Sequence, residues 1–195
     1  MLPNPIRLDT KPPVITVAHE PHAIISPDGD GRHDDFSVPY RVSESAHGIL
    51  RVLPARAEHA QQVEFTRFQR RRGLLVWNGR LPLPPGGPTR AARPGLYVLY
   101  AAAQDSAGNY AKPTPFSIVQ VRYVALARDR VVVRPGGRFA IRVSTDAARV
   151  QWHLDDRSGV ARRGTLHLRV PRQRGVYHLY VLAAGHAARC TVVVA

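Results

Sequence analysis

The sequence of 195 residues has a composition typical of a folded chain, with 44% hydrophobic and 22% charged residues, and its length fits one large domain or two small ones. It has no run of about 18–20 apolar residues, so we expect no membrane span, and its first residues lack the pattern of a signal peptide. A single cysteine, Cys190, excludes an internal disulfide and metal sites built on several thiolates. The net charge of +14 comes almost entirely from arginine. Such a charge attracts polyanions, but the arginines are scattered along the chain, and we favour the alternative that they only solvate the outer faces of sheets.

Short segments that alternate between apolar and polar residues follow one another along the chain, and this period of two is typical of β-strands. We expect strands, in chain order, at 36–42, 49–53, 63–68, 74–77, 95–104, 116–124, 131–133, 139–143, 150–154, 166–170, 176–183 and 190–194. Proline and glycine separate these segments. Only Ala55–Gln62 is compatible with a helix. The pattern therefore predicts an all-β chain made of β-sandwiches.

An internal repeat predicts two domains of one kind. The sequence Gly-Leu-Tyr-Val-Leu-Tyr at 95–100 recurs as Gly-Val-Tyr-His-Leu-Tyr at 175–180. In immunoglobulin-like sandwiches, a tyrosine at this place hydrogen-bonds to an upstream backbone group and fixes a corner of the fold. We expect Tyr97 and Tyr177 to do so. The fold class is thus two tandem immunoglobulin-like β-sandwich domains, at 9–122 and 123–195, with no flexible linker between them.

The first domain also carries a series of motifs with a known order. The segment Ser26–Phe36 is similar to the signature S-P-N-G-D-G-x-N-D, with departures at Asp28 and His33. The other motifs are Asp9–Ile15, Trp77–Gly79 (with Asn78 where the family has Asp), Pro94–Tyr97 and Asp105–Asn109. Together they resemble the bacterial Ig-like domain named after the flagellar hook-capping protein, over residues 9–122. This resemblance implies a non-catalytic spacer, stalk or adhesive module on a secreted or cell-surface protein.

The acidic loop is the one segment whose residues suggest metal chemistry. Four carboxylates lie within residues 28–35, and their mutual repulsion is costly unless a cation or arginines balance it. Calcium takes six to eight oxygen ligands, and Gly29 and Gly31 permit turns that let Asp28, Asp30 and Asp34 converge on it. The alternative is a cluster of Asx turns, in which the aspartates bond to their own backbone. We predict Ca²⁺ at these three residues.

Other conspicuous residues have structural interpretations. Asp105 and Asn109 are expected to form a turn, and we place that turn at the opposite end of the domain from the acidic loop. Trp77 and Trp152 are expected in the cores, and Cys190 is expected to be a buried, inert thiol. The nine histidines lack zinc-site spacing, and no nucleophile or phosphate-loop motif occurs. We therefore predict no enzyme and no catalytic residue.

The sequence favours a structural or interaction module, with neighbouring domains of a larger protein as its partners. Two alternatives remain open. One is a polyanion-binding module, in which arginines of the second domain contact a cell-wall polymer, a glycan or a nucleic acid; of these partners we expect nucleic acid least. Its candidate residues are Arg138, Arg142, Arg149 and Arg169, for which one patch on neighbouring strands is geometrically possible. The interpretation that we favour is that each arginine lies flat over its own sheet, with its stem on apolar surface and its charged end in water. The other is an accessory region of an enzyme whose catalytic domain is absent here.

Overall fold

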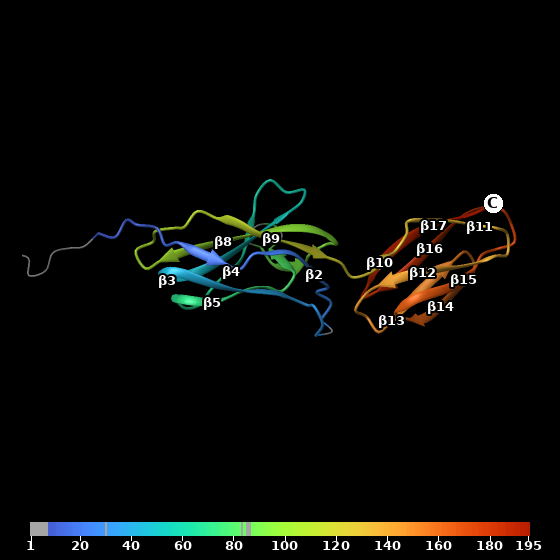
Figure 1. The fold of residues 1–195 in the computed structure, drawn as a ribbon, viewed down its shortest axis with the longest axis horizontal. Helices are drawn as coiled ribbons and strands as arrows, with labels where there is room; N and C mark the ends of the chain where they lie inside the picture. Colours follow the sequence, from blue (N-terminus) through green and yellow to red (C-terminus); the bar gives the residue numbers. More distant parts are fainter. Residues whose placement is uncertain (1–7, 30, 83, 85–86) are drawn as a thin grey trace, which may run out of the picture. The chain divides into compact units, whose positions relative to one another are not determined.

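The computed structural model describes residues 8–29, 31–82, 84 and 87–195, and these residues form β-strands joined by turns (Figure 1). No helix forms in these ranges, so none there has the length and apolar content needed to cross a bilayer. The chain divides into two compact units. Among the described residues, the first unit comprises those within 8–27 and 34–121, and the second comprises 28, 29, 31–33 and 122–195.

The first unit is built on a seven-stranded sheet and a separate pair of short strands. The sheet has the order β1-β3-β8-β9-β2, and β4 and β5 also pair with β3. The sheet strands are β1 (Ile15–Val17), β2 (Glu20–Ile25), β3 (Phe36–Pro54), β4 (Gln61–Phe65), β5 (Arg70–Trp77), β8 (Gly95–Asp105) and β9 (Thr114–Val121). The short pair is β6 (Arg80–Pro82) with β7 (Thr89–Ala91).

Strand β3 organises the first unit because it is long enough to pair with four other strands. Residues 36–42 pair with β1 and β5, whereas 46–54 pair with β8 and, in part, with β4. Its even-numbered residues are mostly buried, as expected for a strand with one face on the core. The sequence pattern predicted two strands here, at 36–42 and 49–53. The structure instead joins them into one, because the alternation continues through the intervening residues.

No helix forms at Ala55–Gln62, in agreement with the prediction of an all-β chain. Residues 55–60 form turns and bends, and β4 begins at Gln61. Most side chains of these turns are exposed, and the backbone N–H of Ala57 donates to the carbonyl of Pro54, which closes a tight turn. The segment offers no apolar stripe that a helix could bury, so packing does not favour one.

The second unit is a sandwich of two sheets around one core. The smaller sheet has the order β10-β12-β15 and the larger one β11-β17-β16-β13-β14. Both contribute to the core: Ile141 and Leu166 come from the smaller sheet, and Val150, Leu179 and Cys190 come from the larger one. The strands are β10 (Ala125–Leu126), β11 (Arg130–Val133), β12 (Arg138–Ser144), β13 (Arg149–Leu154), β14 (Arg157–Arg162), β15 (Gly164–Arg169), β16 (Gly175–Ala183) and β17 (His186–Val194).

Both predicted tyrosine corners are present. The hydroxyl of Tyr97 donates to the carbonyl oxygen of Arg93 at 2.7 Å, and that of Tyr177 donates to the carbonyl oxygen of Gln173 at 3.1 Å. Tyr97 is buried and its ring also packs against Trp77, with 5.1 Å between ring centroids. The prediction of an all-β chain with immunoglobulin-like sandwich domains is confirmed.

Each unit also places an aromatic ring directly opposite a glycine of a neighbouring strand. Tyr40 on β3 pairs with Gly73 on β5, and Trp152 on β13 pairs with Gly159 on β14. A Cβ atom on Gly73 would lie 2.8 Å from Cε1 of Tyr40, and one on Gly159 would lie 2.9 Å from Cζ2 of Trp152. These glycines therefore provide room for the rings. Trp77 is fully buried, as predicted, whereas Trp152 packs against its core and stays partly exposed.

Candidate functional site

The acidic loop keeps part of its predicted geometry. Gly29 and Gly31 both have positive φ, at 84° and 81°, so the backbone makes the sharp turns expected of them. Asp28 and Asp34 are partly buried, and each interacts with other groups of the protein. Asp30 lies outside the described residues. Calcium at Asp28, Asp30 and Asp34 therefore stays a prediction.

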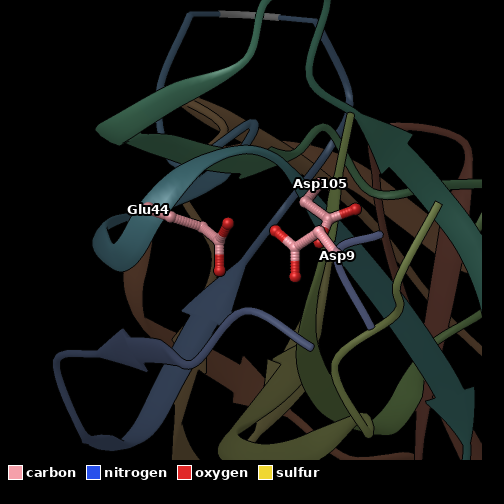
Figure 2. A group of neighbouring side chains, drawn as sticks. All are labelled: Asp9, Glu44 and Asp105. Carbon is pink, nitrogen blue, oxygen red and sulfur yellow. The ribbon is translucent and has the colours of Figure 1, made fainter. Parts of the chain in front are cut away.

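A different group of acids comes together in the first unit. Carboxylate oxygens of Asp9, Glu44 and Asp105 all lie within 4.8 Å of one another. Figure 2 shows the three side chains converging from the segment before β1, from β3 and from the end of β8. Asp9 is exposed, Glu44 is half-buried and Asp105 is only 5% exposed. Three carboxylates at such separations repel one another, and their oxygens are of the kind that hard cations such as Ca²⁺ prefer.

Hydrogen bonds from the following turn hold Asp105 in place. One carboxylate oxygen accepts from the backbone N–H of Asn109 at 2.8 Å, and the other accepts from its side-chain amide at 2.9 Å. Burial disfavours the charged carboxylate, but the bonds from Asn109 and from the amides of Ala107 and Gly108 outweigh it and lower the pKa of Asp105 below 3.8. The predicted turn at Asp105 and Asn109 is confirmed.

Asn109 also connects this turn to the start of the unit. Its side-chain amide donates to the backbone carbonyl of Asp9 at 3.0 Å, and Asp9 accepts from the backbone N–H of Lys11 at 3.1 Å. Asp9 is thereby held beside Asp105. The chain segment before β1 and the turn after β8 are thus joined by side chains that the sequence interpretation assigned to separate motifs.

Sequence reasoning missed this acidic group, although one signal was visible. Glu44 continues the even-numbered series of β3 that otherwise buries apolar residues such as Val42 and Ala46. Asp105 likewise ends the odd-numbered buried series of β8. A carboxylate in a core-facing row needs partners, so these two positions were candidates for one site.

The four arginines proposed for one patch are separated by the fold. Arg138 and Arg169 are direct neighbours on β12 and β15, and Arg142 lies further along β12. Arg149 lies on β13, which belongs to the other sheet of the second unit. The single patch is therefore wrong, because the chain changes sheets between β12 and β13. Two separate arginine pairs replace it, since Arg149 faces Arg162 across β13 and β14.

Cys190 is fully buried in the core of the second unit, as predicted. Burial, together with the charge of Asp129, raises the pKa of its thiol. Since the thiolate is the reactive form, this cysteine is placed for packing and not for chemistry.

Comparison with known proteins gives only distant similarities. No protein-family model matches the chain, and no curated protein is similar to it. Among solved structures, the fibronectin(III)-like modules of Clostridium thermocellum CbhA are 14% identical, with a TM-score of 0.32, over 93% of this chain and 94% of that one. The ectodomain of a teleost fish polymeric Ig receptor is 8% identical, with a TM-score of 0.33, over 93% and 98%. A structure of Dscam is 12% identical, with a TM-score of 0.35, over 96% and 46%.

Proposed function

We propose that this chain is a non-catalytic, load-bearing spacer in a secreted or cell-surface bacterial protein, in keeping with its resemblance to the hook-capping type of Ig-like domain. The supporting observation is a strand pairing that occurs in both units. A strand near the start of each unit runs parallel to the strand that ends it: β2 pairs with β9, and β11 pairs with β17.

Parallel pairing of these strands suits a chain under tension. When the two ends of a unit are pulled apart, the paired strands are drawn in opposite directions along their length. The hydrogen bonds between them then carry the load together and do not open one after another. In the second unit, residues 130–133 pair with 191–194. Further bonds flank them, from the N–H of Thr191 to the carbonyl of Asp129 and from the N–H of Ala195 to the carbonyl of Val133.

Stretching the whole chain from its ends in a single-molecule force experiment tests this role. The carbonyls of Asp129 and Val133 accept from the N–H groups of Thr191 in β17 and of Ala195 just after it. Odd-numbered residues of β11 therefore direct their backbone groups to the ladder, and Val132 does not. Val133→Pro therefore removes a ladder donor, whereas Val132→Pro is the matched control. We expect a lower unfolding force for the second unit in the first variant only. Equal forces in both variants would contradict a load-bearing role.

Calcium stiffening is the finer part of this proposal. The site is the acidic loop, with Asp28, Asp30 and Asp34 as ligands. Thermal unfolding in EDTA and in excess Ca²⁺ tests it, because a ligand that binds only the folded state at 100 times its Kd stabilises it by about 2.7 kcal/mol.

Two variants locate the ion. The double variant Asp28→Asn/Asp34→Asn should lose the calcium-dependent gain in melting temperature, while Glu44→Gln should keep it. Loss in Glu44→Gln alone would place the ion at the other acidic group and refute the loop as the site. No gain in the unaltered chain would refute calcium binding altogether.

A further inference from the structure

Four arginines from other parts of the second unit gather around the turn at residues 134–137, which itself contains Arg134. They are Arg138, Arg157, Arg169 and Arg172, and we call them the arginine cluster. All four are exposed. They come from different parts of the chain: β12, β14, the end of β15 and the segment that follows it. The fold, and not sequence proximity, therefore creates this concentration of charge.

Defined contacts hold the cluster together. Arg138 lies directly opposite Arg169 on β12 and β15. The Nε–H of Arg169 donates to the carbonyl of Gly136 at 2.9 Å, and Nη1 of Arg157 donates to the carbonyl of Arg169 at 3.1 Å. A Cβ atom on Gly136 would lie 3.4 Å from Cγ of Arg172, so the stem of Arg172 runs beside the same turn.

Acidic side chains do not neutralise the arginine cluster within the part of the chain that the structure describes. None of its four guanidinium groups forms an ion pair there. Asp155 and Asp156 precede Arg157 in the same hairpin, and they too form no ion pair with a described residue. Like charges placed directly opposite each other across two strands destabilise a sheet. An anion bound from outside would offset this repulsion.

The free donors of the cluster define the ligand's chemistry. The guanidinium groups of Arg138 and Arg172 make no hydrogen bond to a described residue. A planar guanidinium can donate two parallel hydrogen bonds to a carboxylate, sulfate or phosphate group. Several such groups in one neighbourhood suit a chain with repeated anions better than a single ion.

The adjoining surface favours a polysaccharide over a nucleic acid. Beyond Arg138 and Arg169, the outward positions of β12 and β15 hold Ala140 opposite His167, and then Arg142 opposite Thr165. Apart from the imidazole of His167, this basic strip lacks the aromatic rings on which the bases of single-stranded nucleic acids stack. We propose that the arginine cluster and this strip bind an anionic polysaccharide that carries sulfate or carboxylate groups.

Heparin binding by the full chain tests the site, with two double variants that remove the same charge. Arg138→Gln/Arg172→Gln alters the cluster. Arg149→Gln/Arg162→Gln is the control, since these arginines also face each other across two strands, are exposed and make no hydrogen bond to a described residue. Neither variant removes a hydrogen bond of the fold, so equal melting temperatures should confirm that both remain folded.

The unaltered chain should bind heparin in about 50 mM salt, and its affinity should fall as salt rises because counterions are released. The cluster variant should bind roughly tenfold more weakly, as expected when two exposed charge contacts are lost, and the control should change by less than about threefold. Equal losses in the two variants, or no binding by the unaltered chain, would overturn the site. Tighter binding to single-stranded or duplex DNA than to heparin would overturn the polysaccharide assignment.

Discussion

Replacing Gly73 by alanine should destabilise the first unit, because the ring of Tyr40 occupies the space that the new methyl group needs. The added Cβ would lie 2.8 Å from Cε1 and 2.9 Å from the hydroxyl oxygen of Tyr40. The shortest ordinary contact is 3.4 Å, so the two groups must separate by about 0.6 Å. Tyr40 is only 2% exposed and has little room to move.

The expected loss follows from two opposing effects. Overpacking a core costs about 1–3 kcal/mol, and the smaller entropy of an unfolded chain with alanine returns about 0.4–1 kcal/mol. We therefore expect a net loss of about 1–2 kcal/mol. For a domain of about 100 residues, this lowers the melting temperature by several degrees or more.

Urea unfolding followed by the fluorescence of Trp77 measures this loss, with Trp152→Phe in the background so that only the first unit reports. A double-mutant cycle with Tyr40→Ala isolates the contact, because Gly73→Ala should then cost nothing or stabilise slightly. The same cost on both backgrounds would refute the idea that Tyr40 is what requires glycine at this position.

Three further predictions concern individual side chains. Tyr97→Phe should lower the free energy of unfolding in urea by about 1–1.5 kcal/mol, because it leaves the carbonyl of Arg93 without its donor. Tyr177→Phe should lower it by less, because the hydrogen bond of Tyr177 is longer and exposed. Equal losses in the two variants would contradict this. The charged form of Asp105 stabilises the fold above pH 3.8, and this contribution is lost as pH falls through its lower folded-state pKa. Asp105→Asn should therefore show a shallower fall of melting temperature with acidification, and an unchanged slope would speak against the lowered pKa. Cys190 should react with a thiol reagent only after unfolding in urea, and fast labelling of the folded chain would show that its burial is incomplete.

The strands with a clear apolar alternation were predictable from the sequence. Gly95–Asp105 and Arg138–Ser144 differ from their predicted limits by a residue or two, and both corner tyrosines follow from the repeat around them. By contrast, β14 was missed because Val160 is its only large apolar side chain and is itself exposed. An edge strand of this kind is held by its pairing with β13, and periodicity does not reveal such pairing.

The acidic group and the arginine cluster were harder to predict for one physical reason. Asp9, Glu44 and Asp105 come from three distant segments and meet only after the sheet has formed. The same holds for Arg138 and Arg157, which lie on different sheets. Local patterns locate strands, whereas such sites depend on which strands become neighbours.

The length of β3 also has a consequence for how the first unit acquires its structure during synthesis. Residues 46–54 of β3 cannot pair with β8 until residues 97–105 have been synthesised, some fifty positions later in the chain. Closing such a long loop costs chain entropy before any contact is made, so the pairing of β3 with β8 forms slowly. Until then, β3 exposes an apolar row and unpaired backbone groups, which makes it the segment most open to pairing with another chain. We therefore expect chaperones that bind the nascent chain to contact it chiefly at β3.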